Sequence, residues 1–243
     1  MSTRVRGADP ASYYDQFSEH YDSRRHSGYH ALVDDLEASF VAGNGRGRCL
    51  EAGCGTGLIL SRLTGSFAAV VGVDLSAGML SRASRRGHRV AQGSVAALPF
   101  ASGSFDAVCS FKVLAHVPEI RGAVEELARV VRPGGRLVLE FYNRRSLRGL
   151  RWRAKMLVGG ERTGAGTAET DLFTRYDDLK SIANYLPAGV SIEAVRGCIV
   201  FAPAALCFKL PVIGQALGSL ERRAARSFLA RFGGFVTVVL RKT

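Results

Sequence analysis

The chain has 243 residues, of which 47% are apolar, and this length suits one α/β domain with an elaboration better than two equal domains. Its formal net charge of +12 comes from 33 Lys and Arg against 21 Asp and Glu, which fits either a solvated basic surface or an acidic partner. The longest apolar run, residues 198–208, is shorter than the about 20 residues that cross a bilayer and contains Pro203, so we expect no transmembrane segment.

The N-terminus and the cysteines give an expectation about the compartment. The opening residues "MSTRVRGADP" are not followed by an apolar stretch, so we expect no signal peptide. The five cysteines are odd in number and show neither C-x-x-C nor metal-ligand spacing. We therefore expect a protein of the reducing cytoplasm, without a bound metal.

Two stretches of different character open the chain. Residues 1–45 are polar and aromatic, and we interpret them as an N-terminal helical cap. From residue 46 to 143, short β-branched runs alternate with helical stretches, which is the pattern of a parallel sheet covered by helices. The strands predicted in this core are residues 48–53, 68–74, 88–92, 105–111 and 136–142.

Two helices of the core carry clear boundary signals. Residues 76–87 begin at Ser76, a typical N-cap residue, and end at a glycine. In residues 119–135, helical spacing continues until a Pro-Gly-Gly stop. The apolar positions at that spacing are Ile120, Val124, Leu127 and Val131.

Residues 144–243 are interpreted as the C-terminal part of the same domain. The pattern predicts a helix and then a mobile loop over 143–171, followed by helices at 175–189 and 211–233 and strands at 190–197 and 235–241. Residues 197–232 separate the last two strands, and we interpret them as an apolar lid with a basic outer face. Contact of this segment with a membrane surface or a dimer partner is the alternative.

The stretch "LEAGCGTG", residues 50–57, is a glycine-rich turn between a predicted strand and a helix. Glycine allows a ligand to lie directly against the backbone. A dinucleotide fingerprint would require a third glycine where this chain has Leu58, which weakens that interpretation. Glu51 precedes the glycines and Asp74 ends the next predicted strand, which favours a different nucleoside ligand.

Five segments in order across residues 48–143 resemble the class I S-adenosylmethionine-dependent methyltransferases, in particular the quinone-biosynthesis and small-molecule group. They are "CLEAGCGTG", "VVGVDLSAGML", "AQGSVAALPFASGSFDAVCSF", "VLAHV" and "ELARVVRPGGRLVLEFYN". The resemblance implies a Rossmann-like, seven-stranded, mostly parallel sheet whose last strand is antiparallel, with helices on both faces and a helical lid insertion.

The resemblance also implies a cofactor, S-adenosylmethionine, with S-adenosylhomocysteine as its product. Asp74 would accept hydrogen bonds from the ribose hydroxyls, Leu75 and Met79 would contact the adenine, and Ser94 stands where the family often has an acidic residue. The full set of expected cofactor-binding residues is Tyr14, Glu51, Gly53, Cys54, Gly55, Gly57, Asp74, Leu75, Met79, Ser94, Val95 and Phe111.

Methyl transfer from a sulfonium mainly requires positioning of the donor and the acceptor, and a base is needed only for a protonated acceptor. The candidate catalytic residues are His116, Tyr14 and Tyr142. His116 follows the fourth predicted strand and is either a general base or a histidine at the helix start or the site entrance. Tyr14 belongs to an aromatic cluster that either faces the sulfonium or packs as an ordinary amphipathic helix.

The sequence therefore predicts a methyltransferase acting on O, N or C of a small-molecule acceptor, such as a secondary metabolite, a quinone or a lipid-like compound. The alternatives are an RNA methyltransferase, since the chain is basic, and a protein that binds the cofactor without catalysis. The leucine at position 58, where a third glycine would be required, argues against a NAD-dependent oxidoreductase. We expect a monomer or a homodimer.

Overall fold

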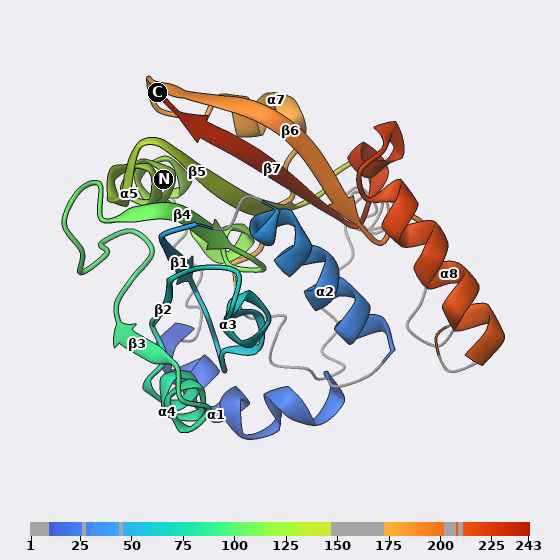
Figure 1. The fold of residues 1–243 in the computed structure, drawn as a ribbon, viewed down its shortest axis with the longest axis horizontal. Coiled ribbons are helices and arrows are strands. Elements are labelled where there is room, and N and C mark those ends of the chain that lie inside the picture. Colours follow the sequence, from blue (N-terminus) through green and yellow to red (C-terminus); the bar gives the residue numbers. More distant parts are fainter. Residues whose placement is uncertain (1–9, 26–27, 44–45, 147–172, 202–207, 209–210) are drawn as a thin grey trace, which may run out of the picture.

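The computed structural model describes residues 10–25, 28–43, 46–146, 173–201, 208 and 211–243. Its centre is a seven-stranded sheet with the order β3-β2-β1-β4-β5-β7-β6 (Figure 1). The strands are β1 Arg48–Ala52, β2 Ala69–Asp74, β3 Arg89–Gln92, β4 Phe105–Ser110, β5 Val131–Tyr142, β6 Val190–Cys198 and β7 Phe235–Lys242. Strands β1 to β5 pair in parallel, whereas β7 is antiparallel to both β5 and β6, which confirms the predicted fold class.

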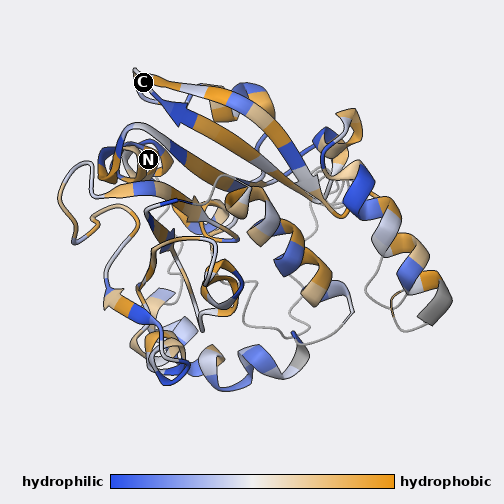
Figure 2. Cartoon of the chain, in the orientation of Figure 1, coloured by the Kyte–Doolittle hydropathy of each residue, from blue (hydrophilic) through white to orange (hydrophobic). Residues whose placement is uncertain are grey.

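The helices cover both faces of this sheet. They are α1 Pro10–Tyr21, α2 Tyr29–Ala42, α3 Leu58–Leu63, α4 Ala77–Arg85, α5 Ile120–Val130, α7 Leu179–Ala183 and α8 Pro211–Ala224, with short 3₁₀ segments η1 Asp22–Arg24, η2 Leu114–His116 and η5 Phe228–Phe232. Side chains alternate between the faces of a strand. Leu50 of β1 accordingly shares a buried cluster with Leu127 of α5, and the neighbouring Cys49 shares one with Phe40 of α2. In Figure 2 the central strands β5 and β7 are mainly hydrophobic, whereas α1 is mainly hydrophilic.

The end of α5 differs from the sequence prediction. Val131 was expected in the helix, but it opens β5, where it pairs with Phe105 of β4. Pro133 disfavours a helical conformation at the residue before it and cannot donate a helical hydrogen bond. In addition, the Lys242 ammonium donates to the carbonyl oxygens of Ala128 and Val131 at 2.8 and 2.7 Å, which satisfies helix-end acceptors from the last strand.

The C-terminal helices are shorter than their sequence patterns predict, whereas β6 and β7 are each one residue longer. Of the helix expected at 175–189, only α7 forms, with the Asp178 carboxylate accepting from the Ser181 N–H at 2.9 Å. The helix expected at 211–233 divides into α8 and η5. Most of the helix and loop predicted at 143–171 lies outside the described residues.

The segment between β6 and β7 lies beside α2 (Figure 1). The Arg226 guanidinium donates to the Ser39 carbonyl at 3.2 Å, and the rings of Phe208 and Tyr29 are 5.9 Å apart. Along the described stretches of the chain, no helix is both long and apolar enough to cross a membrane.

Candidate active site

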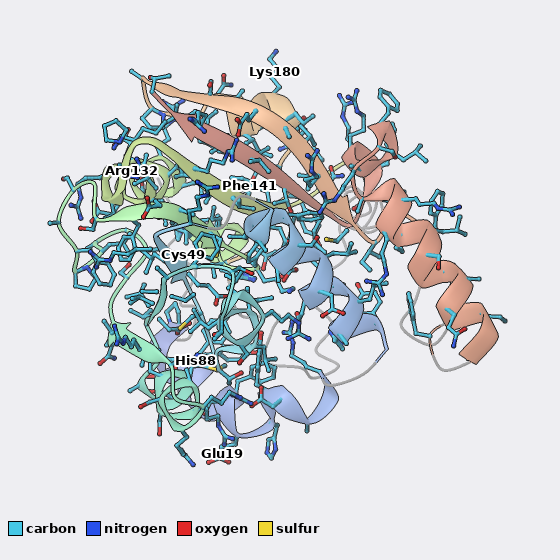
Figure 3. All side chains as sticks on the ribbon, viewed as in Figure 1. Glu19, Cys49, His88, Arg132, Phe141 and Lys180 are labelled. Carbon is cyan, nitrogen blue, oxygen red and sulfur yellow. The ribbon has the colours of Figure 1, made fainter. Side chains whose placement is uncertain are left out.

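The glycine loop joins the end of β1 to the start of α3. Gly53, Gly55 and Gly57 have φ angles of 80, 53 and 83°, in the left-handed region that favours glycine. A Cβ at Gly53 would lie 2.1 Å from the Val113 side chain, and one at Gly57 would lie 2.7 Å from His88, which Figure 3 labels. A Cβ at Gly55 would meet no atom within 4 Å. Gly53 and Gly57 are thus required for packing, while Gly55 leaves its backbone open to a ligand.

Asp74 joins the glycine loop to the start of α4. Its carboxylate accepts hydrogen bonds from the Gly55 N–H at 2.8 Å and from the Ser76 N–H at 2.9 Å, one on each oxygen. Burial raises the pKa of Asp74, and the two N–H donors oppose that rise. Because a carboxylate oxygen can accept more than one hydrogen bond, both oxygens keep acceptor capacity for a ligand.

The predicted N-cap of α4 is confirmed, since the Ser76 hydroxyl accepts from the Met79 N–H at 3.0 Å. Around it, the residues expected to contact adenine differ in exposure. Leu75 is exposed at the sheet edge, whereas Met79 and Val95 are buried. The Ser94 hydroxyl accepts from the Ala96 N–H at 3.2 Å, so part of its hydrogen-bonding capacity is used within its own turn.

Two aspartates fasten the N-terminal helices over this region. The Asp15 carboxylate accepts from the Ser76 hydroxyl at 2.5 Å and from the Gly78 N–H at 2.9 Å. The Asp22 carboxylate accepts from the Thr56 hydroxyl and from the Arg86 guanidinium, both at 2.7 Å. The sequence analysis missed these residues. Their seven-residue separation, which places two carboxylates on one side of a helix, was the available signal.

A cleft beside the glycine loop encloses about 340 Å³ of empty space, part of which is open solvent. Its lining residues are Tyr21, Arg25, Asp34, Glu37, Glu51, Gly53, Cys54, Gly55, Thr56, Leu58, Ile59, Phe111 and Lys112. Five residues of the predicted cofactor-binding set therefore line one cavity: Glu51, Gly53, Cys54, Gly55 and Phe111. The N-terminal helices and α2 provide the opposite wall.

Glu51 is the most unusual group in this cavity. It is 3% exposed, and one of its carboxylate oxygens has no hydrogen-bond partner among the described residues. Burial raises the pKa of Glu51 well above its ordinary value. A buried carboxylate with spare acceptor capacity is suited to a cationic or N–H-donating ligand group.

Charged side chains form the far wall of the cavity. The Lys112 ammonium lies 2.6 Å from the Glu37 carboxylate and 3.4 Å from Asp34, and Arg25 lies 3.0 Å from Asp34. Burial alone would lower the pKa of Lys112, but the negative charges of Glu37 and of Glu140 on β5 raise it above its usual range. Lys112 therefore stays charged and is held by carboxylates of the protein itself.

The structure brings two of the three candidate catalytic residues together. The His116 Nε2 lies 3.5 Å from the Tyr142 hydroxyl, and its Nδ1 lies 2.9 Å from the Phe173 carbonyl oxygen. If Nδ1 donates to that carbonyl, Nε2 carries the lone pair that a base requires. Tyr142 is buried among aromatic rings, 5.3 Å from that of Phe235. Tyr14 lies on α1, where its ring contacts Tyr13 at 5.1 Å.

The chain is similar in sequence to known proteins mainly across this sheet core. Residues 50–139 match the methyltransferase domain family. A demethylmenaquinone methyltransferase of Mycobacterium sp. (strain KMS) is 42% identical over 92 residues, which cover 38% of this chain and 40% of that protein. A malonyl-acyl-carrier-protein O-methyltransferase of Enterobacter lignolyticus is 36% identical over 142 residues, covering 57% of this chain and 54% of that protein. The chain thus matches only about half, or less, of these relatives' length.

Solved structures resemble the whole chain. An S-adenosylmethionine-dependent methyltransferase of Thermotoga maritima superposes with a TM-score of 0.67 at 20% identity, covering 96% of this chain and 99% of its own. The cyclase SpnF superposes with a TM-score of 0.63 at 20% identity, covering 96 and 94%. At this identity the likeness concerns the fold. The chain thus has the fold of S-adenosylmethionine-dependent methyltransferases, and residues 50–139 within it are similar to the methyltransferase domain family.

Proposed function

We propose that this protein binds S-adenosylmethionine and transfers its methyl group to O, N or C of a small-molecule acceptor such as a secondary metabolite, a quinone or a lipid-like compound. The observation that carries the proposal is the open glycine loop at Gly55 between the carboxylates of Asp74 and Glu51. The relatives' names, demethylmenaquinone methyltransferase and malonyl-acyl-carrier-protein O-methyltransferase, support a quinone or acyl-type acceptor group. The cofactor is supported by the DhpI–SAM–HEP complex, whose structure resembles this chain with a TM-score of 0.60.

The residues present fit this cofactor by their chemistry. Asp74 would accept both ribose hydroxyls with its remaining lone pairs, and the exposed Leu75 would cover one face of the adenine. The unpartnered oxygen of Glu51 would accept from the α-ammonium of the methionine part. Gly55 would bring bare backbone to the ligand, within the turn that Gly53, Cys54 and Gly57 form. Ser94 would contribute a neutral hydroxyl near the adenine, flanked by Val95.

His116 would take the proton of an acceptor molecule that is protonated at working pH. The Tyr142 hydroxyl would orient the His116 imidazole, and we call the region around these two residues the acceptor side of the site. Bound S-adenosylmethionine supplies an electrophilic methyl group, so the protein's main contribution is to hold the acceptor in line. Such positioning contributes about 7–11 kcal/mol to lowering a barrier. Phe111 and Tyr14 would shield the reacting groups from water.

Calorimetric titration with S-adenosylhomocysteine tests the cofactor directly. We expect micromolar binding, and Asp74→Ala should weaken it by about tenfold or more because charged hydrogen bonds to the ribose are lost. Asp74→Asn keeps an acceptor oxygen for one of the two N–H groups, so it should weaken binding less than Asp74→Ala. Asp35→Ala is the matched control, since the half-exposed Asp35 pairs with Arg62 and not with the N–H groups that Asp74 accepts from. Tighter binding of NADH than of S-adenosylhomocysteine would refute the proposal.

A further inference from the structure

An apolar patch stands exposed on η5, the 3₁₀ segment before the last strand. It consists of Phe228, Leu229 and Phe232, whose exposed fractions are 65, 41 and 42%. The rings of Phe228 and Phe232 are 6.2 Å apart, so they form one surface rather than isolated side chains. Large aromatic groups grouped in this way on a surface usually mark an interaction site. We call these three residues the η5 patch.

Arginines surround the η5 patch. The Arg231 guanidinium stacks over the Phe228 ring at 3.8 Å, and Arg222, Arg223 and Arg226 are exposed at the end of α8 and just beyond it. Among the described residues, none of these four arginines forms an ion pair with a carboxylate. The carboxylate between 211 and 232, Glu221, is fully buried and accepts from the N–H groups of Val200 and Phe201.

The positive charge is therefore concentrated beside an apolar surface. Burial lowers the pKa of Arg196 on β6, and the neighbouring charge of Arg226 lowers it further. Further along α8, Ile213 and Leu220 are exposed at 49 and 47% and lie seven residues apart, on one side of the helix. A hydrophobic surface flanked by arginines is the composition of an element that lies in the headgroup region of an anionic bilayer.

The η5 patch is attached directly to the proposed acceptor side. The Asn143 side-chain amide donates to the carbonyl oxygens of Arg231 and Gly233, both at 2.8 Å. Asn143 follows Tyr142 at the end of β5, and Phe235 packs against Tyr142 from the start of β7. The patch is thus fixed, through a buried asparagine, next to the pair formed by His116 and Tyr142.

We infer that the η5 patch docks this protein on an anionic lipid surface. The arginines favour an anionic lipid surface over a second copy of this chain. A second copy would bring like charges together, whereas anionic headgroups neutralise the arginines. Phe228, Leu229 and Phe232 would enter the headgroup boundary while Arg222, Arg223 and Arg231 contact phosphates. A second part of the inference, that the acceptor is an amphiphile taken from that surface, rests on the proposed function.

Flotation of the full chain with vesicles tests the docking. We expect the chain to float with vesicles of phosphatidylcholine mixed with phosphatidylglycerol, to float less with phosphatidylcholine alone, and to detach as salt rises. Phe228→Ser combined with Phe232→Ser should weaken binding about tenfold or more. Arg222→Gln combined with Arg223→Gln should weaken it about fivefold for each charge.

Matched controls lie elsewhere on the surface. Phe17→Ser removes an aromatic ring that is 42% exposed, the same fraction as Phe232, but on α1. Arg89→Gln combined with Arg121→Gln removes two exposed charges from β3 and α5. Neither control should change vesicle binding. Equal losses in the controls, or no binding to anionic vesicles by the unmodified chain, would overturn the inference.

Two further measurements are needed. Light scattering distinguishes lipid docking from dimer formation, and binding of S-adenosylhomocysteine distinguishes lipid docking from the proposed function. Light scattering that shows a dimer dissociated by the double phenylalanine variant, without vesicle binding, would assign the patch to a second copy and overturn lipid docking. Binding of S-adenosylhomocysteine should be the same in the patch variants as in the unmodified chain. If no form of the chain binds S-adenosylhomocysteine, the proposed function and the amphiphilic acceptor fail, while the vesicle result still decides docking.

Discussion

At the scale of single residues, Glu51 shows how a binding site and a stable core impose opposite demands. It lies in the middle of the cavity wall, buried and with an oxygen that no described residue satisfies. Such a group destabilises the protein without ligand and becomes favourable only when a ligand donates to it. The same residue should therefore affect stability and binding in opposite directions.

Glu51→Gln tests this opposition. Burial raises the pKa of Glu51 above its ordinary value of 4.5, so the folded state binds the proton more tightly than the unfolded state. The contribution of Glu51 to stability is complete below that ordinary value and is lost as the pH rises through the folded pKa. We expect the Gln variant to melt at a higher temperature than the unmodified chain at neutral pH, with the difference vanishing in acid, and to bind S-adenosylhomocysteine about tenfold more weakly. A variant less stable at neutral pH would show that Glu51 is already satisfied without ligand.

At the scale of elements, the attachment of α1 and η1 decides whether the cavity has its outer wall. Asp22 contacts Thr56 of the glycine loop and Arg86 at the end of α4, which joins three segments at one carboxylate. The Asp15 carboxylate joins α1 to the start of α4 by accepting hydrogen bonds from Ser76 and Gly78. These contacts are few and polar, so the N-terminal helices can open at a small cost in free energy.

Asp22→Ala should detach this wall while leaving the sheet folded. The hydrogen bond to Thr56 is part-buried and the one to Arg86 is exposed, so we expect the free energy of unfolding to fall by about 1 kcal/mol. Binding of S-adenosylhomocysteine should weaken more clearly, and amide exchange should quicken over residues 10–25. The comparison is Asp35→Ala, whose carboxylate pairs with Arg62 instead. Unchanged exchange over residues 10–25 would mean that packing of α1 on α4 holds the wall without Asp22.

At the scale of the whole molecule, a buried ionic cluster connects α2 to the centre of the sheet. Lys112 follows β4, has a left-handed φ of 60°, and reaches Asp34 and Glu37 on α2. Glu140 of β5 is also buried close by, and burial raises its pKa well above the ordinary value. One ammonium thus offsets carboxylates from two elements that are far apart in the sequence.

Lys112→Met should lower the free energy of unfolding of the whole domain. Removing one member of a buried ion pair leaves an uncompensated charge, which costs about 3–5 kcal/mol. The carboxyl groups of Glu37 and Glu140 have raised pKa values, so they can take up protons when the ammonium is removed. The decrease in the free energy of unfolding caused by Lys112→Met should therefore become smaller as the pH falls. Chemical denaturation at neutral and acidic pH measures this, with the exposed Lys180→Met as control (Figure 3). Equal effects of the two substitutions would contradict a structural role for the cluster.

The sequence by itself determined the strands of the core, the glycine loop after β1, the cap at Ser76 and the antiparallel last strand, because these depend on short-range periodicity, turn residues and a resemblance carried by contiguous segments. It misplaced Val131 because the residue that completes the end of α5, Lys242, lies at the other end of the chain. Only the tertiary structure decided that His116 meets Tyr142, that Asp22 meets Thr56 and that Lys112 meets Glu37. Each of these contacts joins segments separated by 26 residues or more, and their geometry is set by the packing of whole elements, which no local pattern encodes.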